Sequence, residues 1–306
     1  MNSQTDHHDM LNGYTTEMVD PRFTELDLLS TYEMVQAMNE AEQEVPRAVA
    51  RAGREISQAI DAIAPRVRSG GRMFYVGAGT PGRLGVLDAS ECPPTFSTQP
   101  HVVQGIIAGG FSALTHAIEG AEDDEQAGRQ DLVERAVNHT DVVIGITASG
   151  RTPYVLAAVE YARECGALTV GISSNIDAEL SRLVDHPIEV VVGPEIISGS
   201  TRLKAGSAQK QVLNMISTLT MVKLGKTYGN LMVDVAASNE KLRARAQNLV
   251  MRITGVGREQ AIRALESSGG DVKTAVVCIV RGVDPRRARE LLVRADGFLR
   301  SAISSQ

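Results

Sequence analysis

The chain has 306 residues, 43% of them hydrophobic, and its 31 Lys and Arg against 37 Asp and Glu give a net charge of −6. This balance provides no general attraction for a polyanion, so we expect no nucleic-acid partner. No run approaches the roughly 20 apolar residues of a membrane-spanning helix, and the polar start lacks the basic and apolar regions of a secretory signal, so we expect a frayed tail, no membrane partner and a cytoplasmic location.

The first region, residues 1–64, is predicted to hold the polar tail and N-terminal helices. Residues 24–67 carry apolar side chains at helical spacing, which predicts two or three helices, and Thr31 is available as an N-cap. The apolar positions are Leu29, Met34, Met38, Val49, Ile56, Ile60 and Ile63.

From residue 72 the pattern changes to short β-rich runs, each followed by a Gly or Ser turn and a helical stretch. The runs are MFYVGAG from Met73, VVQGIIAGG from Val102, VVIGITASG from Val142, LTVGISSN from Leu168 and IEVVVG from Ile188. Strands that alternate with helices predict a parallel sheet with helices on both faces. The predicted fold class is therefore α/β, a three-layer αβα sandwich with a five-stranded parallel sheet, over residues 65–228.

The third predicted region, residues 229–306, is helical. A long helix from about Lys204 to Lys226 should lead into it, followed by a second from Asn230 to Leu249. After residue 250, glycine and proline turns separate three short helical segments, which predicts a small three-helix module. The module resembles bundles of the ubiquitin-associated type, and we interpret it as a packing or oligomerisation unit. The turns are Gly255-Val256-Gly257, Gly269-Gly270 and Asp284-Pro285.

The sequence contains parts of two nucleotide-binding motifs, but neither motif is complete. Gly77, Gly79 and Gly82 form a GxGxxG between a predicted strand and a helix, yet no Asp or Glu occurs from Pro93 to Ile118, where a dinucleotide site needs an acid for the ribose. Gly225-Lys226-Thr227 lacks the first glycine of a phosphate-binding P-loop. The glycine turn can still bind a phosphate, because it directs N–H groups and a helix dipole at one point.

Two further turns are rich in hydroxyl groups and lead into predicted helices. One holds Thr147, Ser149 and Thr152, and the other runs from Ser198 to Lys204. Such hydroxyls often only cap the following helix. Ligands of parallel sheets bind at the carboxyl ends of the strands, however, and the three turns should meet there. Together they favour a site for a sugar phosphate.

Several long contiguous runs of this chain are far more specific than the glycine patterns alone. They are TEMVDPR from Thr16, GAGTPGRLGVLDASECPPTF from Gly77, EGAEDD from Glu119, ITASGRTPYV from Ile146, SGSTRLKAGSAQK from Ser198 and GNLMVDVAASNEKL from Gly229. With these runs the chain resembles, over nearly its whole length, the N-acetylmuramic acid 6-phosphate etherases, which belong to the sugar isomerase (SIS) domain family.

The resemblance implies a homodimeric lyase of cell-wall recycling with shared active sites. It implies that Glu91 is the proton donor, that Glu122 is the second catalytic residue, and that no metal or organic cofactor takes part. The widely spaced Cys92, Cys165 and Cys278, read as reduced thiols, form no zinc or redox pair. The residues implied to bind the sugar phosphate are Gly79, Thr80, Ser149, Gly150, Thr152, Ser200 and Lys204.

The reaction that the resemblance implies needs one general base and one general acid, and two glutamates can provide both. A C1 aldehyde acidifies the C2 proton of the sugar, so one carboxylate can remove it while a carboxylic acid protonates the departing lactate oxygen. We expect Glu91 to be the acid and Glu122 the base. Pattern alone does not select either, because Glu119, Glu122 and Asp123 also resemble the solvated face of a helix. A phosphosugar isomerase and a non-enzymatic SIS sensor remain as alternatives.

One residue departs from the family pattern. Pro81 stands where the family usually has Ser, which removes a hydroxyl and a backbone N–H from the glycine turn. Pro81 suits the first helical position after a Thr80 cap, so we expect the turn to form. We expect Thr80, Ser149, Thr152 and Ser200 to provide more of the phosphate contacts.

Overall fold

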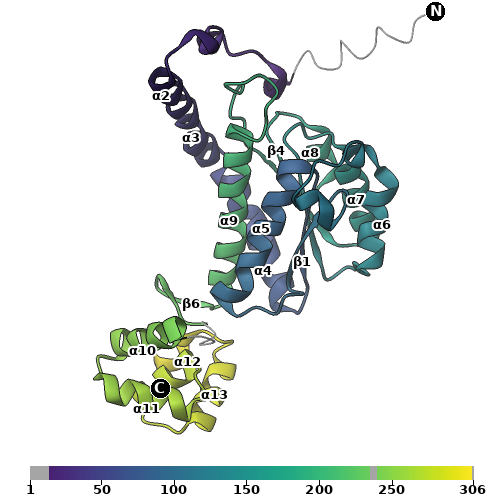
Figure 1. Ribbon diagram of the computed structural model, residues 1–306. Helices are drawn as coiled ribbons and strands as arrows, with labels where there is room; N and C mark the ends of the chain where they lie inside the picture. The colour runs from purple at the N-terminus through teal and green to yellow at the C-terminus, as the bar shows by residue number, and fades with distance from the viewer. Residues whose placement is uncertain (1–13, 235–239, 305–306) are drawn as a thin grey trace, which may run out of the picture. The chain divides into compact units, whose positions relative to one another are not determined.

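A computed structural model of the protein describes residues 14–234 and 240–304 (Figure 1). The described chain forms two compact units. Residues up to 90 together with 101–216 form the first, and residues 91–100 together with 217 onward form the second. No helix among the described residues is long and apolar enough to cross a membrane.

The first unit is built on a parallel sheet of five strands in the order β2-β1-β3-β4-β5, which confirms the predicted fold class. β1 pairs with both β2 and β3, so that Gly77 lies beside Ile107 and Ile146 at the carboxyl ends. β5 begins two residues before the predicted run. The strands are β1 (Met73–Gly77), β2 (Val103–Ile107), β3 (Val142–Ile146), β4 (Leu168–Ser173) and β5 (His186–Glu189).

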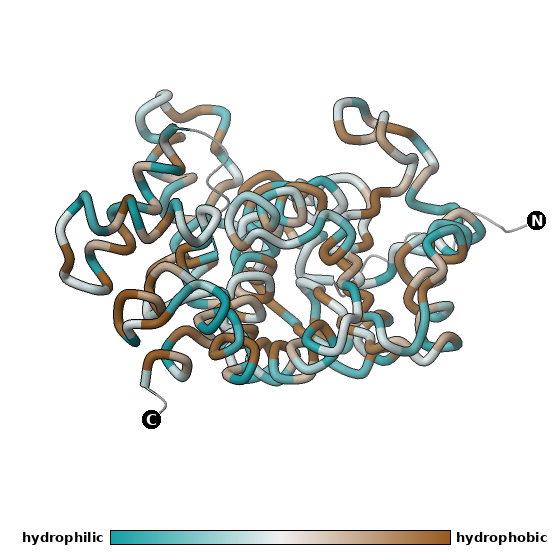
Figure 2. Tube along the Cα trace, turned by 90° about the horizontal axis from the view of Figure 1, so that it is seen from below, coloured by the Kyte–Doolittle hydropathy of each residue, from teal (hydrophilic) through white to brown (hydrophobic). Residues whose placement is uncertain are grey.

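Helices cover both faces of this sheet (Figure 1). One face carries α6 (Glu125–Glu134), α7 (Pro153–Glu164) and α8 (Glu179–Leu183). The other carries α4 (Gly53–Arg68), α5 (Gly79–Phe96) and α9 (Lys204–Lys223). Figure 2 shows polar and apolar residues alternating along the helical segments, as expected for helices with one buried face.

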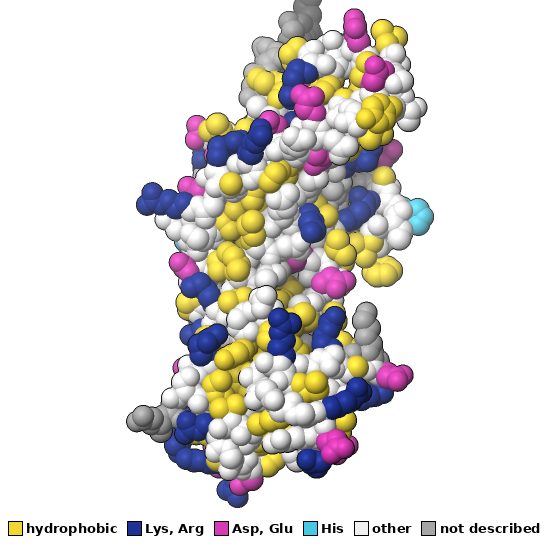
Figure 3. All heavy atoms as spheres, turned by 90° about the vertical axis from the view of Figure 1, so that its left-hand side faces the viewer, with side chains coloured by type: hydrophobic (Ala, Val, Ile, Leu, Met, Phe, Trp, Pro, Cys, Tyr) yellow, Lys and Arg dark blue, Asp and Glu magenta, His cyan; other side chains and the backbone are white. Residues whose placement is uncertain are grey.

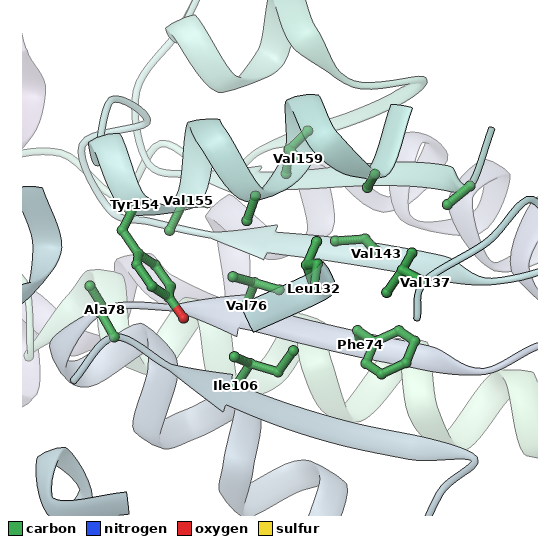
Figure 4. Close-up of a cluster of buried hydrophobic side chains, with 14 of the residues drawn as sticks. Phe74, Val76, Ala78, Ile106, Leu132, Val137, Val143, Tyr154, Val155 and Val159 are labelled. Carbon is green, nitrogen blue, oxygen red and sulfur yellow. The ribbon is translucent and has the colours of Figure 1, made fainter. Parts of the chain in front are cut away.

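The core beneath α7 holds the strand ends in place. Figure 4 shows Tyr154 and Val155 of α7 near Val76 of the sheet, and Phe74 and Val143 farther along the same cluster near Val137. All of these side chains are buried, and Ala78, just after β1, belongs to the same cluster. The packing therefore fixes the points at which β1 and β3 enter their loops.

The N-terminal region contains short 3-10 turns and then two helices. The turns are η1 (Thr15–Glu17), η2 (Pro21–Phe23) and η3 (Leu26–Leu28), and the helices are α2 (Thr31–Glu42) and α3 (Glu44–Arg51). Ser30, and not Thr31 as expected, is the N-cap of α2, because Ser30 and Glu33 form a reciprocal capping box. The predicted tail, residues 1–13, lies outside the described residues.

The second unit has its own hydrophobic core, built from α10 (Glu240–Thr254), α11 (Arg258–Ser267), α12 (Val272–Arg281), α13 (Pro285–Arg294) and α14 (Leu299–Ser304). Lys226 and Lys273 both form ion pairs with Asp234, at 2.9 and 3.0 Å. Residues 240–306 contain 13 Lys and Arg against 7 Asp and Glu. Many of these basic side chains can be seen on the lower part of Figure 3.

A hairpin precedes this module where part of a helix was expected. β6 (Thr227–Tyr228) and β7 (Leu231–Met232) pair antiparallel around Gly229 and Asn230. Gly229 has a φ of +59°, a left-handed conformation typical of two-residue hairpin turns. The predicted helix over 230–249 is therefore wrong at its start, and residues 235–239 lie outside the described residues.

Candidate active site

A cleft of about 810 Å³ lies at the carboxyl ends of β1 and β3. This is the point where the strand order reverses direction, and open parallel sheets bind their ligands there. The volume is in the range of about 300–1,000 Å³ that is usual for small-molecule sites. All of the lining residues belong to the first unit. They come from five segments: the loops after β1 and β3, the loop at residues 199–201, and the two 3-10 turns that contain Glu17 and Glu122.

The loop after β3 contributes a network of hydroxyl groups. Oγ1 of Thr147 lies 2.7 Å from Oγ1 of Thr152 and 3.3 Å from Oγ of Ser149. The N–H of Gly150 donates to Oγ1 of Thr147, and the N–H of Arg151 donates to Oγ of Ser149. The hydroxyls are thus held in one orientation at the start of α7, where the helix dipole favours an anion.

Thr152 occupies the N-cap position of α7, but its side chain makes no capping hydrogen bond. Its hydroxyl contacts Thr147 instead. Simple helix capping, the alternative considered for this hydroxyl, is therefore not its role. Ser149, Thr152 and Pro153 all line the cleft.

The glycine turn after β1 is tightly packed. A Cβ atom on Gly77 would lie 2.6 Å from the backbone nitrogen of Gly82, which explains why two of the three motif glycines are needed. Gly79 has a φ of +58°. Helix α5 begins at Gly79, so Thr80 and Pro81 both lie in its first turn, and Thr80 is not the expected cap. Gly79, Thr80 and Pro81 line the cleft.

The loop of residues 198–203, which precedes α9 and is here called the third loop, lines the cleft with Gly199 and Thr201. These two residues flank the predicted Ser200. The predicted Lys204 is 1% exposed, and its Nζ donates to the carbonyl oxygen of Val192 at 2.8 Å. Burial lowers the pKa of Lys204. Its ammonium group therefore bonds to the protein backbone inside the first unit.

The carboxyl group of Glu195 organises the start of α9. It accepts hydrogen bonds from the backbone N–H groups of Lys204 at 2.9 Å and Ala205 at 3.0 Å. Burial raises the pKa of Glu195. These contacts hold the third loop against the sheet.

Acidic side chains form the remaining wall. Glu122 and Asp123 come from η5 (Ala121–Asp123), whose first residue packs against the core beneath α7. Glu17 comes from η1. Among the described residues, none of these three carboxylates has a hydrogen-bond or ion-pair partner. They are available to a ligand.

The structure brings together Gly79, Thr80, Ser149, Thr152 and Glu122 of the predicted site residues. Gly150 and Ser200 are adjacent to lining residues. Glu91 is exposed in the later part of α5 and belongs to the second unit.

Sequence reasoning did not single out Glu17. Its only signal is its place in the run TEMVDPR, because a lone acid near a chain start has no chemical context of its own. Asn175 was also missed, although its buried amide bonds to the loop after β3.

Comparisons with known proteins give consistent matches. The model of the glucokinase regulatory protein N-terminal SIS domain matches residues 55–163, and the SIS domain model matches residues 124–219. A relative from Streptomyces avermitilis, named N-acetylmuramic acid 6-phosphate etherase, is 54% identical over 308 residues, which cover 100% of this chain and 99% of that relative. One of the same name from Rubrobacter xylanophilus is 55% identical and covers 96% of this chain and 97% of its own.

A solved structure of a phosphoheptose isomerase from Francisella tularensis is similar in fold. The TM-score is 0.50 at 16% sequence identity, and the match covers 63% of this chain and 100% of that one. At this identity the likeness extends to the fold alone.

Proposed function

Because this chain belongs to the N-acetylmuramic acid 6-phosphate etherases and is an etherase of cell-wall recycling, we propose that it acts as a carbon–oxygen lyase. The reaction converts N-acetylmuramic acid 6-phosphate and water into N-acetylglucosamine 6-phosphate and D-lactate. The ether at C3 is unactivated, so the bond breaks by elimination and not by direct displacement.

The elimination begins from the open-chain sugar. The C1 aldehyde acidifies the proton on C2, and Glu122 removes that proton as general base. The electron pair forms the C2–C3 double bond as the C3–oxygen bond breaks, and Glu91 protonates the lactate oxygen. Water then adds to C3 and a proton returns to C2, which completes the product.

The observation that supports this function best is the composition of one cleft. Hydroxyl and glycine loops suited to a phosphate lie on one side, and the unpartnered carboxylate of Glu122 lies on the same cleft. A phosphate fixed at helix N-termini would hold the sugar chain in reach of a carboxylate base.

Assembly and location complete the proposal. We propose a homodimer with shared active sites, in which Glu91 and Glu122 act on one substrate. Cys92, Cys165 and Cys278 form no disulfide bond in the part of the chain that the structure describes, which is typical of a reducing compartment and supports a cytoplasmic location.

Incubation of the purified protein with N-acetylmuramic acid 6-phosphate, followed by an enzymatic assay for D-lactate, tests the proposal. Stoichiometric formation of D-lactate and N-acetylglucosamine 6-phosphate is the expected result. Interconversion of an aldose and a ketose phosphate without lactate would indicate an isomerase. Binding without turnover would indicate a sensor, and either outcome would contradict the proposal.

A further inference from the structure

The segment of residues 14–20, here called the N-terminal strap, is attached to the phosphate side of the cleft by a buried amide. Oγ1 of Thr15 donates to Oδ1 of Asn175 at 2.9 Å, and Nδ2 of Asn175 donates to Oγ1 of Thr16 at 3.2 Å. Asn175 is 2% exposed and Thr16 is 1% exposed. These contacts join parts of the chain that are about 160 residues apart in sequence.

The same amide also holds the hydroxyl loop after β3. Nδ2 of Asn175 donates to the carbonyl oxygens of Ala148 and Ser149, both at 3.2 Å. The guanidinium of Arg151 lies 4.6 Å from the ring centre of Tyr14. The strap and the hydroxyl loop are therefore positioned by one set of contacts.

A second attachment joins the strap to the third loop of the cleft. Oγ of Ser198 lies 3.3 Å from the carbonyl oxygens of both Glu17 and Met18 and donates to them. A Cβ atom placed on Gly199 would lie 3.6 Å from Oε2 of Glu17. The carboxylate of Glu17 thus lies beside the loop that contributes Gly199 and Thr201 to the cleft wall.

The strap uses its hydroxyls and backbone for attachment but not the Glu17 carboxylate. This side chain is partly buried and lines the cleft, and no described residue forms a hydrogen bond or an ion pair with it. A negative carboxylate repels a phosphate, whereas it accepts strong hydrogen bonds from hydroxyl groups. Its chemistry fits the hydroxylated carbon chain of a sugar.

We propose that Glu17 is a substrate-binding residue whose carboxylate accepts hydrogen bonds from the hydroxyl groups of the bound sugar phosphate. The strap would then make the cleft selective for a hydroxylated ligand over a bare phosphate. The inference rests on the proposed function for the identity of the ligand.

Calorimetric titration with two probes tests this role. Glu17→Gln should bind N-acetylglucosamine 6-phosphate about tenfold more weakly than the parent, since a hydrogen bond to a charged acceptor becomes one to a neutral amide. The dissociation constant for inorganic phosphate should stay the same or fall, because the variant removes a negative charge from the cleft wall. The control Glu25→Gln, an exposed acid just before η3, should leave both constants at the parent values.

Two results would overturn the proposal. One is an unchanged affinity of Glu17→Gln for the sugar phosphate. The other is equal weakening for both probes, as expected if Glu17 only supports the fold. Glu17→Asp, which keeps the charge, should recover part of the lost affinity if the charge is what binds the sugar. D-lactate release by the parent is measured separately, so the two proposals fail independently.

Discussion

The loop at residues 147–153 and the turn at Ala121–Asp123 both border the cleft, but they differ in whether their polar side chains form hydrogen bonds within the protein. The hydroxyls of Thr147, Ser149 and Thr152 bond to one another and to backbone N–H groups. The carboxylates of Glu122 and Asp123 have no partners among the described residues. The first side is organised before a ligand arrives, as binding requires, and the second keeps groups free for proton transfer.

The largest effect is expected on the acidic side. Glu122→Gln keeps the size of the side chain but removes the base, so D-lactate release should fall about 10²–10⁴-fold. Calorimetry should show affinity for N-acetylglucosamine 6-phosphate close to the parent value, because the phosphate side is intact. The exposed neighbour Glu119 provides a matched control, and Glu119→Gln should keep the parent rate. A Glu122→Gln protein that releases D-lactate at the parent rate would show that the acidic side does not provide the base for proton transfer.

A substitution at Gly150 should disrupt the hydroxyl loop after β3, which forms the phosphate side of the cleft. This residue has a φ of +80°, and an added Cβ atom would lie 2.3 Å from Cβ of Ala178. Gly150→Ala should lower the free energy of unfolding by about 2–5 kcal/mol through backbone strain and overlap. Gly53→Ala, at an open helical position, should be neutral or slightly stabilising in the same thermal melts. Equal melting temperatures for the two variants would show that this loop is not rigidly built.

Pro81 should give the smallest effect. The residue lines the cleft in the first turn of α5, where serine would restore a hydroxyl and a backbone N–H. Pro81→Ser should bind N-acetylglucosamine 6-phosphate at least as tightly as the parent, and up to about tenfold more tightly. Pro81→Ala restores only the N–H and separates the two contributions. Clearly weaker binding by Pro81→Ser would contradict the expectation that other hydroxyls already hold the phosphate.

The sheet was predictable because each strand is a short apolar run that ends in a Gly or Ser turn. This pattern depends only on neighbouring residues, and the strands of the structure follow it. The hairpin of β6 and β7 was not, because strands of two residues carry no periodicity. Lys204 was grouped with the ligand loops, since its sequence context shows a charge beside hydroxyls but not its burial against Val192. Glu17 was missed because its position depends on contacts to Asn175 and Ser198, far away in sequence.

Elimination through C2 is the central claim, and the fate of the C2 hydrogen tests it most directly. The reaction is run to completion in deuterium oxide, and the N-acetylglucosamine 6-phosphate formed is examined by proton NMR. Removal of the C2 proton by a carboxylate, followed by return of a proton from solvent, predicts deuterium at C2 of the product. A product that keeps its original hydrogen at C2 would contradict the account, because the ether would then have been cleaved without the proton transfer assigned to the cleft.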